Sequence, residues 1–144
     1  MRKTGLQEIV LTVLAVGLLA GALGGQQSPP PAKPPAPEYK IPPEAAQKAN
    51  PVKPTAESLA KAKKLYAIDC AMCHGEKGDG KGDMASDIKN VTDFTNPEVQ
   101  KARTDGEWFY IIRHGKGEMP PEGDRAKDDD VWSLVNYIRA FGKK

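Results

Sequence analysis

The sequence predicts an all-α fold of four to five short helices. Apolar residues recur at helical spacing in several segments, no segment shows the alternation of a strand, and Gly- and Asp-rich loops separate the helical stretches. The 144 residues suffice for one domain, but their composition divides them into three parts. We expect a targeting segment over residues 1–25, a proline-rich linker over 26–54 and the helical domain over 55–144.

The first part has the pattern of an export signal. Arg2 and Lys3 precede an uncharged apolar run of 15 residues, Ile9–Leu23, which is shorter than the roughly 20 residues that a helix needs to cross a bilayer. Small residues around Ala22 resemble a cleavage site. Two interpretations stay open: a cleaved signal peptide, or an uncleaved anchor in which residues 6–25 tether the protein to the inner membrane. Both place the domain outside the cytoplasm, in the periplasm.

The linker holds ten of the 13 prolines in the chain. Proline favours extended polyproline structure, so residues 26–54 could reach on the order of 90 Å at about 3.1 Å per residue. A long, stiff spacer makes physical sense if its far end is held, which favours the anchor. A disordered tail without a function is the alternative. Within the linker, residues 42–50 have the composition for one or two helical turns.

The charge distribution argues against one class of partner. The whole chain carries a net charge of +2, with +3 in residues 1–54 and −1 in residues 55–144. Nucleic-acid-binding domains normally carry a clustered basic face. The domain shows no such cluster, so we expect no nucleic-acid partner.

Four segments of the domain carry helix start and stop signals. Thr55 and Asn96 are expected N-caps, Thr104 and Glu107 resemble a capping box, and Gly142 ends the last segment. We expect helices in TAESLAKAKKLYAIDC (55–70), PEVQKAR (97–103), EWFYIIRHG (107–115) and DDDVWSLVNYIRAF (128–141). These helices offer few large apolar side chains, and small domains in that position usually need a disulfide, a metal or another covalent or bound support.

The stretch CAMCH, residues 70–74, holds both cysteines of the chain and one of its two histidines. A disulfide between Cys70 and Cys73 would close too small a loop to restrict the unfolded chain much. A zinc site needs four ligands, and the adjacent Cys73 and His74 are awkward joint ligands. A thioredoxin-type dithiol expects alternating strands and helices around it. These three interpretations are weaker than a fourth, because C-x-x-C-H is the pattern of covalent haem attachment.

Each residue of the motif has a role in haem attachment. The thiols of Cys70 and Cys73 can bond the two vinyl groups of one porphyrin, and His74 can then bind the iron as an axial ligand. One haem c with its iron would also supply the apolar volume that the domain lacks. Export agrees with this interpretation, because such attachment takes place outside the bacterial cytoplasm.

The second axial ligand decides the chemistry, because a methionine raises the reduction potential and closes the iron to other ligands. Met84 lies in a Gly-rich loop, where packing on the domain is the simpler role. Met119 lies 45 residues after His74, far enough to return on the opposite face, and Pro120 stiffens its backbone. We therefore expect Met119 to be the second ligand. His114 is expected to be a solvated helix-end residue, with a role as substitute ligand or propionate neighbour as the minor alternative.

Three stretches, LYAIDCAMCHG (65–75), IIRHGKGEMP (111–120) and LVNYIRAF (134–141), follow one another in an order typical of one family. Through them, residues 55–144 resemble a small bacterial class I cytochrome c. The resemblance implies the all-α cytochrome c fold, in which the first and last helices cross beside one covalently bound haem. Residues of the first helix would meet the last helix at this crossing: Ala62 and Tyr66 against Leu134, Tyr137 and Ile138.

The resemblance also implies surroundings for the haem. The family often places a proline shortly after C-x-x-C-H, and the carbonyl of this proline accepts a hydrogen bond from the ligating imidazole. Residues 75–83 contain no proline, yet an acceptor is expected because it orients the ring and tunes the iron. Trp108, Phe109 and Ile112 are expected to line the haem pocket, although ordinary core packing explains them equally well.

These features predict a one-electron carrier in a periplasmic respiratory chain, not an enzyme, with His74 and Met119 bound in both oxidation states. One alternative is a fixed haem relay subunit of a membrane oxidoreductase complex. Another is a haem enzyme or sensor that binds a small ligand, which Met119 argues against. The expected partners are redox proteins: a quinol-oxidising complex, a dehydrogenase or a terminal oxidase. Interleaved charges predict weak electrostatic steering of these partners: Lys77, Lys81 and Lys116 alternate with Asp79, Asp83 and Glu118.

Overall fold

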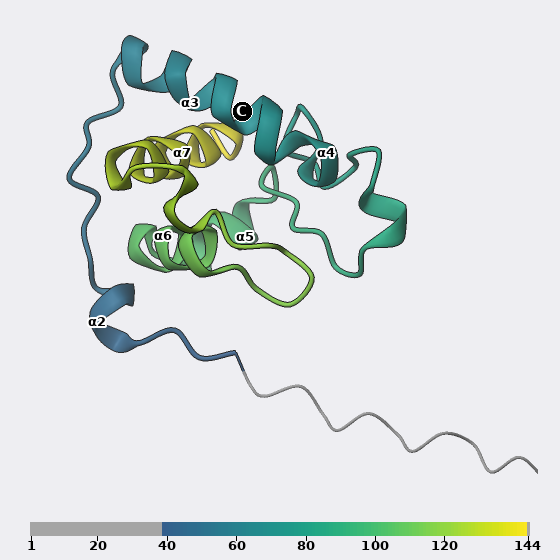
Figure 1. Cartoon of the computed structure of the whole chain (residues 1–144), viewed down its shortest axis with the longest axis horizontal. Helices are drawn as coiled ribbons and strands as arrows, with labels where there is room; N and C mark the ends of the chain where they lie inside the picture. The colour runs from purple at the N-terminus through teal and green to yellow at the C-terminus, as the bar shows by residue number, and fades with distance from the viewer. Residues whose placement is uncertain (1–38, 144) are drawn as a thin grey trace, which may run out of the picture. The chain divides into compact units, whose positions relative to one another are not determined.

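The computed structural model describes residues 39–143, so the predicted targeting segment and the first part of the predicted linker lie outside the described residues. The described part is helical and its segments form no β-strand, which confirms the predicted all-α class. Figure 1 shows α3 lying across α7, with α5 and α6 beneath α7. The elements in chain order are α2 (Pro43–Ala46), α3 (Ala56–Asp69), α4 (Ala71–His74), η1 (Ala85–Asp87), α5 (Pro97–Lys101), α6 (Asp105–His114), η2 (Gly123–Arg125) and α7 (Asp128–Phe141).

Side-chain caps begin three of these helices, as the sequence predicts. Thr55 Oγ1 accepts a hydrogen bond from the Ser58 amide at 3.1 Å in front of α3. In front of α6, Thr104 Oγ1 accepts from the Glu107 amide at 3.1 Å and the Thr104 amide donates to Glu107 Oε2 at 2.7 Å, which completes a capping box. Asn96 caps α5, and Gly142 follows the last residue of α7.

The crossing of α3 and α7 forms the centre of the core. The Ala62 and Tyr66 side chains of α3 are each only 1% exposed, and Val131, Leu134 and Val135 of α7 are fully buried. The Tyr66 and Tyr137 rings lie 5.3 Å apart between centroids. Each fully buried aliphatic side chain contributes about 1.5–3 kcal/mol, so this crossing is a major source of stability.

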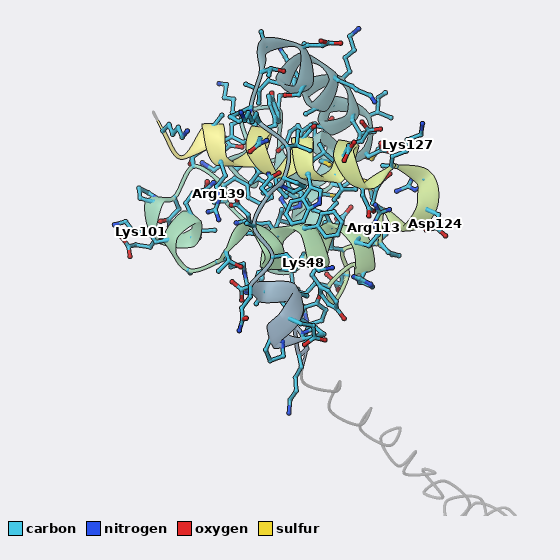
Figure 2. All side chains as sticks on the ribbon, turned by 90° about the vertical axis from the view of Figure 1, so that its left-hand side faces the viewer. Lys48, Lys101, Arg113, Asp124, Lys127 and Arg139 are labelled. Carbon is cyan, nitrogen blue, oxygen red and sulfur yellow. The ribbon has the colours of Figure 1, made fainter. Side chains whose placement is uncertain are left out.

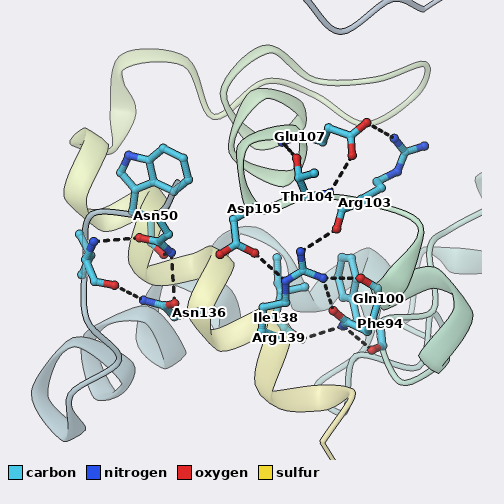
Figure 3. A network of polar contacts seen from close by, with 12 residues as sticks. Asn50, Phe94, Gln100, Arg103, Thr104, Asp105, Glu107, Asn136, Ile138 and Arg139 are labelled. Atoms are coloured by element: carbon cyan, nitrogen blue, oxygen red, sulfur yellow. Dashed lines mark hydrogen bonds and ion pairs between the residues drawn. The ribbon is translucent and has the colours of Figure 1, made fainter. Parts of the chain in front are cut away.

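Two arginines fix the ends of α7. Figure 2 shows Arg139 at one end of this helix and Arg113 near the other end. Arg139 Nε donates to Asp105 Oδ1 at 2.7 Å, and its Nη2 donates to the Arg103 carbonyl at 2.7 Å. Figure 3 shows how this network joins the end of α7 to the segment between α5 and α6. At the start of α7, Arg113 donates to Asp128 and to the Ala126 carbonyl.

Residues 39–54 pack on the helical domain, and we call them the N-terminal strap. Asn50 Nδ2 donates to the Trp132 carbonyl at 3.0 Å, and Asn136 Nδ2 donates to the Val52 carbonyl at 2.8 Å. The Ala46 carbonyl accepts from Thr104 Oγ1 at 2.6 Å. The strap thus contacts α6 and α7 directly, although it lies before Thr55, where the sequence predicts that the domain begins.

A single glycine permits this packing. A Cβ at position 106 would collide with the Ala45 carbonyl and lie 2.9 Å from the Lys48 carbonyl. The first turn of α6 and the strap therefore touch backbone to backbone. Among residues 39–143, no helix is both long and apolar enough to cross a membrane.

Candidate haem-binding site

The chemistry-bearing residues of CAMCH lie where α3 passes into α4. Cys70 ends α3 and precedes α4, and its carbonyl accepts the His74 amide at 2.9 Å. Gly75 ends α4 with φ at +76°, a conformation that glycine adopts without strain. One helical turn therefore presents two thiols and an imidazole within five residues.

The Gly-rich loop after α4 holds this turn in place. Its amides satisfy the carbonyls at the end of α4: Gly80 donates to His74, Gly82 to Cys73 and Met84 to Met72, at 2.9–3.1 Å. A Cβ at position 82 would collide with the Met72 carbonyl. The loop glycines are thus required for close backbone packing on the motif.

The His74 ring is buried and oriented by a backbone carbonyl. It is 9% exposed, and its Nδ1 lies 3.1 Å from the Thr92 carbonyl oxygen. Because a carbonyl only accepts, Nδ1 carries the proton and Nε2 is left as the nitrogen with a free lone pair. Burial lowers the pKa of His74, although the hydrogen bond to Thr92 acts in the opposite direction. A neutral, oriented imidazole is the form that binds a metal.

The role of the Thr92 carbonyl was not predicted from the sequence. The family's expected acceptor is a proline carbonyl close to the motif, whereas Thr92 lies 18 residues after His74. Any residue can supply a carbonyl, so its side chain gives no signal. Phe94, two residues after Thr92, stacks its ring on the His74 ring with 4.5 Å between the centroids.

The thiols of Cys70 and Cys73 are both half-buried. Cys70 and Cys73 are not joined by a disulfide. Burial, followed by the nearby Asp69 carboxylate, raises the pKa of Cys70 to about 12, so this thiol is protonated at neutral pH. Reactive dithiols instead have depressed pKa values. Among residues 39–143, no cluster of three or more His, Cys, Asp and Glu side chains could hold a metal ion, as a zinc site would require.

Met119 is half-buried and packs against the same hydrophobic core as Cys70. It ends a tight turn in which Lys116 and Met119 exchange two backbone hydrogen bonds of 3.0 Å. Gly115, before this turn, has no room for a Cβ, which would lie 2.6 Å from the Met119 carbonyl oxygen. We call residues 116–119 the Met119 turn.

The competing ligand candidates are surface residues. Met84 is 42% exposed and Met72 is 53% exposed. His114 is exposed at the end of α6, where its ring stacks on Tyr110 at 4.0 Å and its Nδ1 lies 2.9 Å from the Tyr110 carbonyl. For Met84 and His114 the sequence predicts minor roles, and the structure places both at the surface.

One buried donor indicates that the core accommodates a polar partner from outside the chain. Trp108 is 4% exposed, and its indole Nε1 has no hydrogen-bond partner among the described residues. An unpaired buried donor costs about 1–3 kcal/mol. The guanidinium of Arg103 lies 5.8 Å from the Trp108 ring centre, so an anionic acceptor is favoured here. A haem propionate has this chemistry. Phe109 is also expected from the sequence to line the haem pocket. Its ring stacks on the Trp132 ring, with 4.1 Å between the ring centroids.

The structure places a buried, neutral imidazole beside two cysteines, at the end of a helix that crosses α7. This arrangement of helices and motif is that of class I monohaem c-type cytochromes. Comparisons with known proteins agree. The chain belongs to the family described as "Cytochrome C oxidase, cbb3-type, subunit III", whose profile matches residues 57–138. Its cofactor is a covalently bound haem c with iron, and the family is one of electron carriers.

Three relatives show the range of proteins that share this domain. Cytochrome c6 of Cladophora glomerata is 32% identical over 83 residues, which cover 58% of this chain and 88% of that protein. The cbb3-type cytochrome c oxidase subunit FixP of Azorhizobium caulinodans is 30% identical over 92 residues, which cover 57% of this chain but only 27% of FixP. The solved structure of the c-type cytochrome KustC0563 matches with a TM-score of 0.51 and 28% identity, over 56% of this chain and 95% of that one.

Proposed function

We propose that this protein is a mobile one-electron carrier of a periplasmic respiratory chain. Cys70 and Cys73 would hold the haem covalently, and His74 and Met119 would bind its iron. The observation that carries the proposal is the His74 ring, which is buried, kept neutral and oriented by the Thr92 carbonyl at 3.1 Å. The haem iron supplies a single electron that it gains and loses.

With His74 and Met119 as ligands, the chemistry would be limited to that exchange. The Thr92 carbonyl fixes the His74 ring, and the short Met119 turn restricts the sulfur, so little structure needs to change with the oxidation state. A methionine ligand favours the reduced form and leaves no open position for a substrate. The exchange of one electron would require no proton donor from the chain.

The visible spectrum of the purified protein, together with its intact mass, tests this proposal. We expect one haem per chain, low-spin iron in both oxidation states, and no ready binding of carbon monoxide. Met119→Ala should become high-spin and bind carbon monoxide, because an axial position opens. Met84→Ala is the matched control and should keep the parent spectrum. A Met119→Ala protein that stays low-spin would exclude Met119 as the ligand.

A fixed relay in a membrane oxidoreductase complex is the second candidate. It is supported by the description of the matching family and by the FixP relative. Gentle detergent extraction followed by size-exclusion chromatography separates the two candidates. Elution of the haem with a large complex favours the relay, whereas elution at the mass of the single chain favours the carrier.

We propose export for both candidates, on the pattern of residues 1–25. N-terminal sequencing distinguishes cleavage from anchoring. A mature protein that begins near Leu23 or Gly25 indicates a cleaved signal peptide, and retention of residues 6–25 in membranes indicates a tether.

A further inference from the structure

Residues 89–94, which we call the bridging segment, contact both parts of the chain that carry the proposed iron ligands. Near its end, the Thr92 carbonyl orients the His74 ring. At its start, the Lys89 amide donates a hydrogen bond to Glu118 Oε2 at 2.9 Å. Glu118 immediately precedes Met119. One piece of chain therefore joins the surroundings of both ligands.

The bridging segment is fixed on the side of the attachment motif. The Phe94 amide donates to the Gly78 carbonyl at 2.7 Å, within the loop that follows CAMCH. A Cβ at Gly80 would lie 3.2 Å from the Val91 carbonyl oxygen, so these backbones are in close contact. Asn90 makes the bend between Lys89 and these contacts, with φ at +60°; asparagine is one of the few residues that tolerate this conformation.

The Met119 turn has a fixed shape but few contacts at its tip. Its two internal hydrogen bonds join Lys116 to Met119. Gly117 and Glu118 are exposed, and nothing lies within 4 Å of a Cβ placed on Gly117. Apart from the packing of Met119 on the core, the turn makes outside contacts through the Glu118 carboxylate and the Lys116 ammonium, which lies 5.5 Å from the Tyr39 ring centre. Glu118 thus supplies the contact that joins this turn to the bridging segment.

We propose that Glu118 is a positioning residue for Met119. Its carboxylate holds the Met119 turn against the bridging segment, which orients His74, so the two ligands are fixed relative to each other through one short stretch of backbone. The bond joins an ionised acceptor to a backbone amide, which is stronger than a neutral pair. This inference rests on the proposed function, in which Met119 binds the iron. Loss of the hydrogen bond between Glu118 and the Lys89 amide should increase the fraction of oxidised protein in which the Met119 sulfur has left the iron.

Imidazole binding to the full-length oxidised haem protein measures that fraction. Imidazole binds where the sulfur has left, so its apparent affinity rises in proportion to the dissociated population. For Glu118→Ala we expect an affinity roughly three- to tenfold higher than for the parent, a weaker sulfur-to-iron charge-transfer band and a lower reduction potential. Glu118→Gln keeps an acceptor oxygen and should lie between the two. Asp124→Ala removes the same charge from the same loop, at an exposed residue, and should match the parent.

The same bond can be removed from its donor side. Lys89→Pro lacks the amide hydrogen, and the preceding Ile88 already has φ −117° and ψ 130°, which proline favours in its neighbour. This variant should raise the imidazole affinity as Glu118→Ala does, whereas Lys89→Ala should not. The double variant of Lys89→Pro and Glu118→Ala should bind imidazole no more tightly than either single variant, because both remove one interaction.

The outcomes separate this inference from the proposed function. A parent protein without the charge-transfer band overturns ligation by Met119 and the role of Glu118 together. A parent with the band, but with unchanged imidazole affinity and potential in Glu118→Ala and Lys89→Pro, overturns the role of Glu118 alone.

Discussion

At the scale of single residues, the Tyr66 hydroxyl connects the helix crossing to the haem-attachment motif. Tyr66 is 1% exposed, and its hydroxyl donates to the Gly75 carbonyl at 2.9 Å. Gly75 directly follows His74, so α3 is joined to the end of α4 by a buried hydrogen bond as well as by the chain. The ring itself packs against Tyr137 and Phe141 of α7.

Removal of this hydroxyl has a pH-dependent effect. Burial raises the pKa of Tyr66 above its ordinary value of 10.0. Below pH 10, Tyr66 holds its proton in both the folded and the unfolded state. Above pH 10, the unfolded state releases the proton first. The contribution of the protonated Tyr66 to the free energy of unfolding is therefore lost as the pH rises. We expect Tyr66→Phe to lower the free energy of unfolding by about 1–2 kcal/mol at pH 7. The difference in the free energy of unfolding between Tyr66→Phe and the parent should become smaller above pH 10.

Urea unfolding of both proteins at neutral and strongly alkaline pH measures the effect. Tyr137→Phe is the control at neutral pH, because the structure assigns no hydrogen bond to the Tyr137 hydroxyl. It is no control at alkaline pH, because burial also raises the pKa of Tyr137. A gap between Tyr66→Phe and the parent that stays constant across the alkaline range would contradict the assignment of the pH dependence to Tyr66.

At the scale of elements, local signals account for the helices, and long-range contacts account for what the sequence did not predict. The caps at Thr55, Asn96 and Thr104 are short-range features, and all three begin helices. In the N-terminal strap, Pro43 begins the short helix α2, as the composition of residues 42–50 predicts. No local signal predicts that the strap packs on the domain, because it is held by contacts such as that of Asn50 with Asn136, 86 residues away.

In the candidate site, too, local signals account for some features and long-range contacts account for the others. The positions of Cys70, Cys73 and His74 on one turn follow from the motif. The Thr92 carbonyl and the Lys89 amide are backbone groups that every sequence contains, so their roles depend on the fold. From the sequence, Glu118 could be described only by its charge, because its hydrogen-bond partner, Lys89, lies 29 residues earlier in the chain.

The strap makes a prediction at this scale through Gly106. In an isolated helix, alanine is about 1 kcal/mol more favourable than glycine. Here the added methyl group would collide with the Ala45 carbonyl, so Gly106→Ala should instead destabilise the protein by about 1–3 kcal/mol, as overpacking does. We also expect faster tryptic cleavage after the exposed Lys48, because the strap is displaced.

Thermal unfolding and the cleavage rate together test this prediction. Gln47→Ala, at an exposed strap position with no side-chain hydrogen bond in the structure, should leave both measurements unchanged. A Gly106→Ala protein that is more stable than the parent and is cleaved at the same rate would show that the strap is not docked on α6.

At the scale of the whole molecule, the described unit is electrically balanced. Residues 39–143 hold 17 basic and 17 acidic side chains. Many of these pair with each other across elements, such as Lys61 with Asp130 at 2.5 Å and Arg125 with Asp69 at 3.6 Å. Of the charges predicted to interleave, Lys77 and Lys81 lie in the short loop after the attachment motif together with Asp79 and Asp83, and the Lys81 amide donates to Asp79 Oδ1 at 3.2 Å. Lys116 and Glu118 lie together in the Met119 turn.

This balance predicts weak electrostatic steering of redox partners. Steered association requires a net charge or a one-signed patch, and its rate falls steeply when salt shortens the Debye length from about 30 Å at 0.01 M to about 3 Å at 1 M. We expect the second-order rate constants for oxidation by an anionic and by a cationic inorganic complex each to change by less than about threefold over that range. Stopped-flow measurement of the reduced protein gives both rates. A steep salt dependence of opposite sign for the two reagents would instead locate a one-signed field at the site of electron exchange, which the balance of charges does not produce.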